Sequence, residues 1–421
     1  MSQRKPASVR PRVVILGTGF GGVHTYSRLR NILNPQEADI VLIDRNNYFL
    51  FTPMLHEVAT GGLNRQHIIE PTRRIIRRSA DDLLIAEVKM INLDKKTVRT
   101  SKGTIPYDYL VIATGATTNF FGVPGAQKYS CVLKNLGDAV RLRDHFIDTF
   151  EKASRINNRA DRQRMLSFAV VGGGATGVEL AAEMADFFYK TFAAYYKNIY
   201  CAEEVRLCLV NRGAELIGQF HPALRAKALE ILKEKGVEVR LNSGVEEVTK
   251  DGLKLSEGGF LPAQTVVWTA GVTPNTPQFK SKIEIERGRI KVDDFLRVKG
   301  RKDIFALGDV AQFVQGKDAR PLPMLAQVAT KEARVAARNI ARSIRGKAPK
   351  SFLYHSKGEL LSLGQWRAIG NIFGMNLSGP HIWWLWRTVY LLKFNSWVKR
   401  VKIAIDWTVN AFAPRDIAKT E

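Results

Sequence analysis

Three glycines, Gly17, Gly19 and Gly22, follow a short apolar run and have the spacing G-x-G-x-x-G. Glycine at these places lets a strand turn sharply, lets the backbone approach a pyrophosphate and lets the next helix pack close to the sheet. Asp44 ends the next apolar run, 22 residues beyond Gly22, where a carboxylate accepts hydrogen bonds from ribose hydroxyls. The pattern predicts a dinucleotide whose phosphates lie at a helix N-terminus.

A second glycine group, Gly172, Gly174 and Gly177, repeats this pattern later in the chain. Its next apolar run ends at Asn211, which Arg212 follows, so no acid occupies the ribose position. An uncharged residue beside an arginine suits the 2′-phosphate of NADPH. Equally, the Asn211 amide binds the ribose of NADH while Arg212 faces solvent. The sequence predicts a nicotinamide dinucleotide here and leaves the choice between NADH and NADPH open.

Two further turns indicate that the first dinucleotide is FAD. Ala113, Thr114 and Gly115 end one apolar strand, and Gly308 and Asp309 end another. In flavoproteins of the two-dinucleotide class, turns of these types pack against the flavin, and the aspartate binds the ribityl chain. Asp309 alone is also compatible with an ordinary helix cap. The four motifs in this order favour FAD in the first site and the nicotinamide in the second.

The cysteines bear on the electron acceptor. Cys131, Cys201 and Cys208 form neither a C-x-x-C nor a C-x-x-x-x-C pair, so neither a metal finger nor a redox dithiol is indicated. No metal is expected. A second flavin-flanking cysteine, which sulfide:quinone oxidoreductases need, is missing beyond Cys208. We therefore expect electrons to leave the flavin directly for a small acceptor.

The elements that must position these residues form two βαβ units. Residues 12–17, a helix to about 33 and residues 40–44 make the first; residues 168–174, a helix from about 176 and residues 205–210 make the second. Further strands are expected at 109–115, 265–271 and 304–309, with a helix over 324–344. The prediction is an α/β fold with two Rossmann-like domains. The FAD-binding domain spans 1–125 and 292–350, the NAD(P)H-binding domain spans 126–291, and a C-terminal membrane-association region spans 351–421.

Composition and charge point to an anionic partner. The chain has 421 residues and a formal net charge of +24, which suits phosphates, nucleic acid or acidic lipid. We expect neither a signal peptide nor a transmembrane helix, because no apolar segment of the required kind occurs.

The last region is rich in tryptophan interleaved with basic residues. Five of the seven tryptophans lie between residues 383 and 407: Trp383, Trp384, Trp386, Trp397 and Trp407. Indole rings favour the lipid headgroup region and cations bind anionic lipid, so the pattern predicts an amphipathic membrane-surface segment. The rival interpretation is a pair of helices used for domain packing or dimerisation.

The chain resembles the type II NADH dehydrogenases, the NADH:quinone oxidoreductases among the two-dinucleotide-binding flavoproteins. The resemblance lies in NNYFLFTPMLHEVATGGL (46–63), YDYLVIATGA (107–116), GGGATGVELAAEMADF (172–187), VVWTAGVTPN (266–275), IFALGDVA (304–311), AQVA (326–329), FLYHSKGELLSLG (352–364) and the Trp-rich tail. It covers residues 12 to about 416 and is most specific in the C-terminal portion.

The resemblance implies roles for particular residues. Glu179 would assist proton delivery near the flavin and the quinone, and Gln327 would line the quinone pocket. The family often has a second glutamine four positions after Gln327, where this chain has Lys331. Lys357 resembles a flavin-side lysine.

Motifs and resemblance together give the following predicted site. The FAD residues are Gly17, Gly19, Phe20, Gly21, Gly22, Asp44, Arg45, Pro53, Val88, Ala113, Thr114, Gly115, Gly308, Asp309, Gln327 and Lys357. The NAD(P)H residues are Gly172, Gly174, Ala175, Thr176, Gly177, Glu179, Asn211, Arg212 and Gly271. Glu179 and Gln327 are the predicted catalytic residues, and Gln327 and Lys331 are the predicted quinone contacts.

The predicted function is a respiratory-chain NAD(P)H:quinone oxidoreductase that does not pump protons. Its predicted location is peripheral, on the cytoplasmic face of the cell membrane, with a membrane quinone and anionic lipid as partners and a homodimer left open. The alternative is a soluble flavoprotein reductase of a protein electron carrier. A nucleic-acid-binding scaffold would also use the basic surface, but no nucleic-acid motif occurs and none is expected as a partner.

Overall fold

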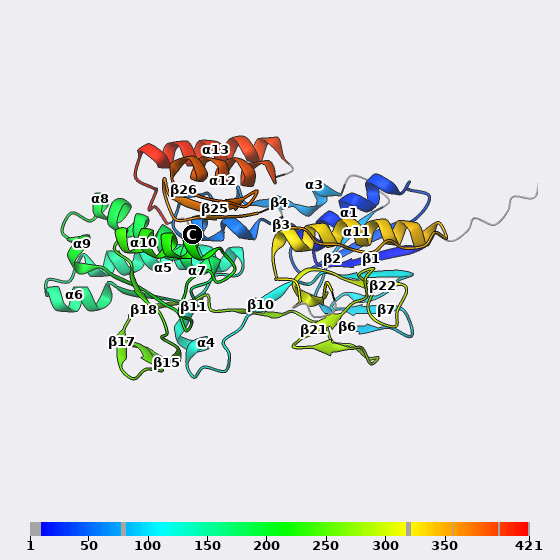
Figure 1. Ribbon diagram of the computed structural model, residues 1–421, viewed down its shortest axis with the longest axis horizontal. Helices are drawn as coiled ribbons and strands as arrows, with labels where there is room; N and C mark the ends of the chain where they lie inside the picture. The colour runs from blue at the N-terminus through cyan, green and yellow to red at the C-terminus, as the bar shows by residue number, and fades with distance from the viewer. Residues whose placement is uncertain (1–9, 77–80, 317–320, 357, 395, 420–421) are drawn as a thin grey trace, which may run out of the picture. The chain divides into compact units, whose positions relative to one another are not determined.

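The computed structural model describes residues 10–76, 81–316, 321–356, 358–394 and 396–419. The chain forms two compact units (Figure 1). The first contains residues 1–50, 69–117 and 272–355, and the second contains residues 51–68, 118–271 and 356–421. Residues 51–68, which the sequence assigned to the FAD-binding domain, and the C-terminal region thus belong to the second unit. The predicted domain boundaries stay a prediction.

A five-stranded parallel sheet forms the centre of the first unit. Its strands are ordered β22-β9-β1-β2-β5, and each neighbouring pair is parallel. Residues 13–16 of β1 are fully buried, which explains why this strand is a continuous apolar run rather than an alternating one. The strands are β1 (Arg12–Leu16), β2 (Asp39–Asp44), β5 (Asp82–Ile85), β9 (Tyr109–Ile112) and β22 (Ile304–Ala306).

Two helices pack beside each other in this unit, α1 (Phe20–Ile32) and α11 (Ala326–Ile344) (Figure 1). The alanines of α11 at 333, 336, 337 and 341 are buried, and these small side chains let the two helices approach closely. A separate antiparallel sheet contains β6 (Val88–Asn92), β7 (Thr97–Thr100) and β8 (Gly103–Pro106).

The second unit contains another five-stranded parallel sheet, with the order β11-β18-β12-β13-β14. Its helices include α2 (Leu55–Ala59), α5 (Leu136–Ala153), α7 (Ala175–Asp186) and α10 (Pro222–Glu234). After α7 the chain continues as a π-helix, η2 (Phe187–Phe192). The strands are β11 (Ser130–Val132), β12 (Ser167–Val171), β13 (Arg206–Val210), β14 (Glu238–Arg240) and β18 (Thr265–Trp268).

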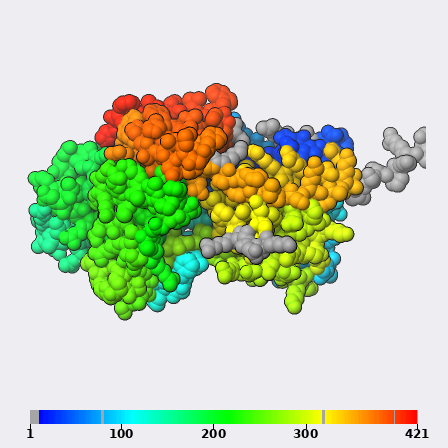
Figure 2. Space-filling model, viewed as in Figure 1, coloured from blue at the N-terminus to red at the C-terminus, as the bar shows by residue number. Residues whose placement is uncertain are grey.

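The C-terminal part of the second unit is an antiparallel sheet followed by two helices. The strands β24 (Glu359–Ser362), β25 (Ala368–Ile372) and β26 (Met375–Ser378) precede α12 (Pro380–Leu392) and α13 (Trp397–Phe412). Trp383 and Trp386 are fully buried, whereas α12 and α13 each keep an exposed side, visible as the orange and red surface in Figure 2. Among the residues that the structure describes, no helix has the length and apolar character needed to span a bilayer.

The predicted α/β fold with two parallel dinucleotide-type sheets is confirmed. Both βαβ units occur where the glycine motifs placed them, as β1-α1-β2 and β12-α7-β13. The reason is local: each glycine turn separates an apolar strand from a helix with one buried face.

Candidate functional site

The first glycine turn connects β1 to α1. Gly17 has φ +96°, and a Cβ on Gly22 would collide with the carbonyl of Gly17, so both positions require glycine. The helix then begins at Phe20 and Gly21, with Gly19 as its extended N-cap and no side chain of the described residues capping it. Unpaired N–H groups and the positive end of the helix dipole suit a pyrophosphate at this point.

Asp44 lies at the end of β2, beside the glycine turn. Its carboxylate accepts hydrogen bonds from the backbone N–H of Thr18 at 2.7 Å and of Asn46 at 2.8 Å. These bonds fix a negative acceptor where the motif predicts the ribose. Arg45 is exposed, and Val88 begins β6 half-buried.

The two flavin turns end the neighbouring strands of the same sheet. Ala113, Thr114 and Gly115 follow β9, and Thr114 Oγ1 donates to the carbonyl of Asn275 at 2.7 Å. Gly308 and Asp309 follow β22. Because carboxyl ends of parallel strands share one edge of a sheet, these turns, the first glycine turn and Asp44 lie along the same edge, the usual ligand position in such folds.

Glu332 on α11 supports this edge, although the sequence did not single it out. It is 2% exposed, and its carboxyl oxygen accepts the backbone N–H of Gly308 at 2.6 Å. Burial raises the pKa of Glu332 to about 7, with Arg289 and the Gly308 bond acting against the rise. Glu332 therefore holds the backbone next to Asp309.

The other residues predicted near the flavin are spread over the chain. Gln327 is the second residue of α11. The Lys331 ammonium donates to the carbonyl of His355 and lies 4.7 Å from the centre of the Tyr354 ring. Pro53 belongs to the second unit, and Lys357 lies outside the described residues.

The second glycine turn has the same construction as the first. Gly172 has φ +115°, and a Cβ on Gly177 would collide with the Gly172 carbonyl, so strand and helix are joined as closely as in the FAD motif. Gly174 is the extended N-cap, and Ala175 and Thr176 begin α7. Gly271 follows β18, whose carboxyl end lies at the same edge as those of β12 and β13.

Asn211, at the end of β13, uses its side chain inside the protein. Its Oδ1 accepts the backbone N–H of Gly173 at 3.0 Å, and its Nδ2 donates to the carbonyls of Gly213 at 3.0 Å and Glu215 at 2.8 Å. Asn211 thus holds the glycine turn to the following loop. Arg212 is exposed.

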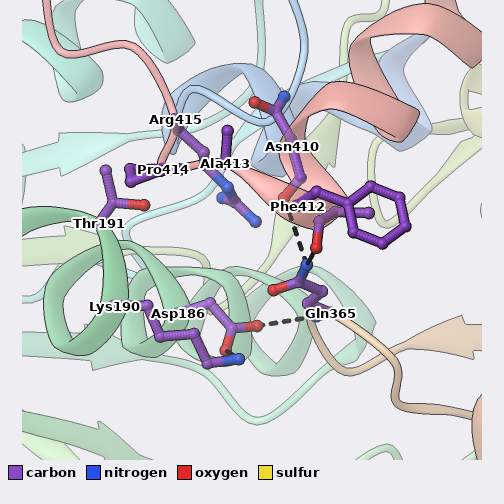
Figure 3. A pocket seen from close by; sticks show the side chains of 10 residues that line it. Asp186, Lys190, Thr191, Gln365, Asn410, Phe412, Ala413, Pro414 and Arg415 are labelled. Atoms are coloured by element: carbon purple, nitrogen blue, oxygen red, sulfur yellow. Dashed lines mark hydrogen bonds and ion pairs between the residues drawn. The ribbon is translucent and has the colours of Figure 1, made fainter. Parts of the chain in front are cut away.

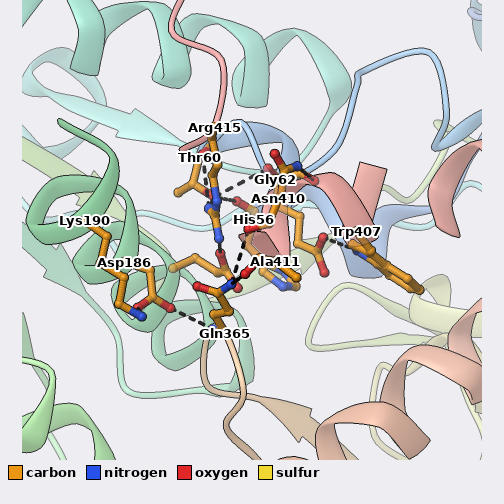
Figure 4. A network of polar contacts seen from close by, with 12 residues as sticks. His56, Thr60, Gly62, Asp186, Lys190, Gln365, Trp407, Asn410, Ala411 and Arg415 are labelled. Atoms are coloured by element: carbon orange, nitrogen blue, oxygen red, sulfur yellow. Dashed lines mark hydrogen bonds and ion pairs between the residues drawn. The ribbon is translucent and has the colours of Figure 1, made fainter. Parts of the chain in front are cut away.

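The helix α7 carries three buried acids on one face. Glu179, Glu183 and Asp186 are spaced by four and three residues, and they are 9%, 4% and 4% exposed. Buried carboxylates need partners, and α7 obtains them from other segments of the second unit, among them α2 and the C-terminal segment (Figure 4).

Glu179 has the most perturbed environment of the three. Burial raises its pKa well above the ordinary value, and although a hydrogen bond from the Ser362 backbone lowers it, the charges of Glu57 and Glu183 raise it further. Its Oε2 lies 3.8 Å from His56 Nδ1. Burial lowers the pKa of His56 to about 4, so this imidazole is neutral at pH 7 and the contact is not an ion pair.

Glu57, on α2, faces the same cluster. It is buried, and its Oε2 accepts the indole N–H of Trp407 at 2.6 Å. Burial and the charge of Glu183 raise the pKa of Glu57 to about 7, while Arg387 lowers it. The Arg387 guanidinium stacks 3.5 Å from the ring centre of Trp383.

Arg415 reaches this cluster from the end of the chain. Its guanidinium bonds to Glu183 Oε2 at 2.5 Å and to the hydroxyl and carbonyl of Thr60 at 2.9 and 3.1 Å (Figure 4). Arg415 therefore ties the C-terminal segment to both α2 and α7.

Asp186 adjoins a polar cavity of about 200 Å³ (Figure 3). Burial acts to raise the pKa of Asp186, but Lys235 and Lys190, both at 2.7 Å, lower it overall. The cavity lining is Asp186, Lys190, Thr191, Gln365, Asn410, Ala411, Phe412, Ala413, Pro414 and Arg415.

Glu179 was predicted from the sequence, but the group of residues around it was not. One local signal was present, because acids at 179, 183 and 186 recur on one face of an otherwise apolar helix. Glu57, Arg387 and Arg415 carry no such signal, since they come from distant segments that only the fold brings together.

Two family models match the chain. The model described as pyridine nucleotide-disulphide oxidoreductase matches residues 11–333, and the NDH2 C-terminal domain matches residues 356–416. A type II NADH:quinone oxidoreductase of Staphylococcus epidermidis is 30% identical over 376 residues, 89% of this chain and 92% of that protein. A probable NADH dehydrogenase of Dictyostelium discoideum is 34% identical over 418 residues, 97% of this chain and 91% of that protein.

Solved structures share the fold. NDH2 from Plasmodium falciparum, solved in complex with NADH, matches with a TM-score of 0.88 and 24% identity, covering 98% of this chain and all of that one (100%). The sulfide:quinone oxidoreductase from Aquifex aeolicus matches with a TM-score of 0.71 and 20% identity, over 96% of this chain and 95% of that one.

Proposed function

This chain belongs to the pyridine nucleotide-disulphide oxidoreductases and, among them, to the type II NADH:quinone oxidoreductases, and on that basis we propose how its residues serve the reaction. It is an FAD-dependent enzyme that oxidises NADH, reduces a quinone and does not pump protons. The observation that carries the assignment is the pair of glycine turns, each at the carboxyl edge of its own parallel sheet, in one chain with the NDH2 C-terminal domain.

The residues of the first unit fit FAD. The uncapped N-terminus of α1 offers N–H groups to the pyrophosphate, and Asp44 is held in place to accept the ribose hydroxyls. Asp309 would bind the ribityl chain, on a turn that Glu332 fixes. When bound, the flavin accepts hydride from the nicotinamide and passes two electrons to the quinone.

The second unit would bind the nicotinamide dinucleotide in the same way, with its phosphates at the N-terminus of α7. The Asn211 amide forms its hydrogen bonds with the glycine turn and with the following loop. Its contribution to ribose binding is therefore to hold the backbone of the glycine turn in place. Arg212, exposed at the end of β13, is the residue that would admit the 2′-phosphate of NADPH.

Quinone reduction consumes two protons, and Glu179 is the proposed relay. A carboxyl whose pKa is raised by burial keeps its proton to higher pH than an exposed carboxyl does, and it can release that proton to a developing quinol oxygen. Gln327, at the N-terminus of α11, would contact the quinone, with Lys331 one helical turn further on.

The membrane surface is the proposed location. The exposed side of α13 carries apolar residues three or four positions apart, which form one stripe along the helix. Trp397 is 71% exposed and Phe412 is 85% exposed, an arrangement typical of helices that lie in the lipid headgroup region. The stripe consists of Trp397, Val401, Ile405, Val409 and Phe412.

Basic residues flank this stripe, including Lys399, Arg400 and Lys402 on α13. Their charge favours an anionic leaflet, which supports the cytoplasmic face of the cell membrane as the proposed side. A homodimer stays a prediction.

The test is stopped-flow absorbance of the purified full-length protein. Flavin bleaching is followed with NADH and, separately, with NADPH, and a short-chain quinone is then added. We expect bleaching by NADH and rapid reoxidation by the quinone. The ratio of the two bleaching rates measures what Arg212 contributes, and Arg212→Ala should lower only the NADPH rate.

Three results would contradict the proposal. Protein purified without flavin would remove its basis, and bleaching without reoxidation by quinones would favour a reductase of a protein electron carrier instead. Proton translocation during turnover in sealed vesicles would contradict the absence of pumping.

A further inference from the structure

The buried cluster formed by α7 and α2 contains more carboxyl groups than its two buried arginines can neutralise. Glu57, Glu179 and Glu183 are buried together with the guanidinium groups of Arg387 and Arg415. Buried charges persist only when they are paired. Two arginines balance two carboxylates, so the third carboxyl is expected to hold a proton.

The pairing of each acid shows where this proton resides. Glu183 forms a direct ion pair with Arg415, and Asp186 is paired with Lys235 and Lys190. Glu57 accepts a neutral indole N–H, and the nearest ring nitrogen to Glu179 belongs to the neutral His56. Within the described chain, neither Glu57 nor Glu179 has a lysine or arginine within 4.0 Å. The proton therefore belongs to Glu57 and Glu179.

We propose that Glu57 is a positioning residue for quinone reduction, which shares a buried proton with Glu179 and is controlled by Arg387 from α12. This rests on the function proposed above and adds a second carboxyl to the proton relay. The charge of each carboxyl opposes ionisation of the other, so the pair titrates as one system. Arg387 stabilises the Glu57 carboxylate and so sets how firmly the pair keeps its proton.

The proton balance of one turnover follows. Reduction of the quinone takes two electrons and two protons; the hydride of NADH would supply both electrons and one proton by way of the cofactor, and the Glu179 carboxyl would supply the other proton as it becomes a carboxylate. Loss of the shared proton leaves both carboxyl groups ionised, with the Glu57 carboxylate stabilised by the Trp407 N–H and by the charge of Arg387. Solvent returns the proton, and the polar cavity beside Arg415 has room for several water molecules.

Several charged or titratable groups face this pair from the packed elements. They are His56 on α2, Glu183 on α7, Arg387 and Tyr390 on α12, and Arg415 in the C-terminal segment. His56 is neutral near pH 7 because burial lowers its pKa to about 4, and Glu183 is held in an ion pair with Arg415. Glu57 and Glu179, whose pKa values are raised by burial, are the carboxyl groups of this cluster that we expect to change charge as the pH rises.

The experiment compares Glu57→Gln with the wild-type holoenzyme. The glutamine keeps an oxygen for the Trp407 N–H and removes the charge that raises the pKa of Glu179. We expect the alkaline limb of the quinone-dependent reoxidation rate to move about one pH unit lower. The rate of flavin reduction by NADH should not change.

A second readout does not depend on turnover. The infrared carbonyl band of a protonated carboxylic acid is titrated in both proteins from pH 5 to 9. Glu332 contributes equally to both and cancels in the difference. We expect the difference spectrum to show that the Glu57 band is lost in the variant. The band of the remaining acid, Glu179, should titrate with its midpoint at a lower pH than in the wild type.

Arg387→Gln should shift the alkaline limb of the pH profile in the opposite direction. Loss of the cation raises the pKa of Glu57, so the alkaline limb should move to higher pH, and Arg387→Lys should restore it. Glu203→Gln is the matched control, because this exposed glutamate pairs only with Arg159 on the surface of the same unit. Its pH profile should equal that of the wild type.

The outcomes separate this inference from the function itself. If wild-type flavin is not reoxidised by quinone, the proposed function fails. If wild-type reoxidation is rapid but neither Glu57→Gln nor Arg387→Gln moves the pH limb or the infrared midpoint, only the shared proton is refuted.

Discussion

Glu332 shows how a residue outside the predicted binding set can control a binding turn. Its carboxyl accepts the Gly308 N–H inside the first unit, and a buried N–H without an acceptor costs about 1–3 kcal/mol. We expect Glu332→Ala to weaken FAD binding about 10-fold or more and Glu332→Gln to bind FAD nearly as the wild type does. FAD retained per polypeptide and reconstitution of the apoprotein followed by flavin fluorescence measure this. Equal FAD affinity in the alanine variant would refute the role of the bond.

The same residue makes stability depend on pH. Burial raises the pKa of Glu332 from 4.5 to about 7, so the folded state favours the protonated carboxyl. The stabilising contribution is complete below about pH 4.5 and is lost as pH rises through 7. Between pH 5 and pH 8, the free energy of unfolding of the wild type should therefore fall by up to about 3 kcal/mol more than that of Glu332→Gln. Urea unfolding at both pH values tests this, and parallel losses in the two proteins would contradict it.

At the scale of the element, α13 has two faces with different tasks. Ile403 and Trp407 are buried against the second unit, while Trp397 and Ile405 lie on the exposed stripe. Burial of one large apolar side chain in lipid contributes about 1.5–3 kcal/mol. We expect Trp397→Ser/Ile405→Ser to lower binding to anionic vesicles at least about 10-fold without changing flavin reduction by NADH.

Vesicle co-sedimentation measures this binding. Phe260→Ser is the matched control, because Phe260 is an exposed aromatic residue (50%) in a hairpin of the same unit, and its substitution should leave sedimentation unchanged. Retention of vesicle binding by the double variant would show that the stripe has another partner, such as a second copy of the chain.

The helix α7 illustrates what its own residues determine and what its neighbours add. Its glycine turn and its acids three and four residues apart follow from the sequence. The environments of those acids do not follow from the sequence. Asp186 forms ion pairs with two lysines and Glu183 forms one with Arg415, whereas Glu179 contacts a neutral histidine. The same residue types on one face therefore end with a lowered pKa at Asp186 and a raised pKa at Glu179.

At the scale of the whole molecule, Arg415 joins segments that are far apart in the chain. Its ion pair with Glu183 is buried, and removal of one partner of such a pair costs about 3–5 kcal/mol because the other charge stays buried alone. We expect Arg415→Met to lower the free energy of unfolding by about this amount. The double variant Arg415→Met/Glu183→Gln should recover most of the loss.

Chemical denaturation followed by intrinsic tryptophan fluorescence provides the measurement, since most tryptophans lie in this C-terminal part of the chain. Additive losses in the double variant would mean that the two residues stabilise the unit independently. Lys419→Gln, which breaks an exposed pair with Asp148, is the control and should change stability by less than about 1 kcal/mol.

The sequence by itself determined the two βαβ units, the order of the flavin and nicotinamide motifs and the amphipathic C-terminal helices. These follow from local rules: glycine where strand and helix must approach, apolar runs in buried parallel strands, and a helical period in the exposed stripe. Gly17 and Gly172, both with positive φ, are instances that the spacing alone predicts.

The tertiary structure alone decided the environments of the polar groups. Glu332 meets Gly308 across 24 residues, Trp407 meets Glu57 across 350 and Arg415 meets Glu183 across 232. Neither spacing nor residue type predicts such pairs, because burial and charge around a side chain depend on every element that packs against it. The proton chemistry of this enzyme therefore depends on the fold, whereas the order of its motifs already predicted FAD in the first site and a nicotinamide dinucleotide in the second.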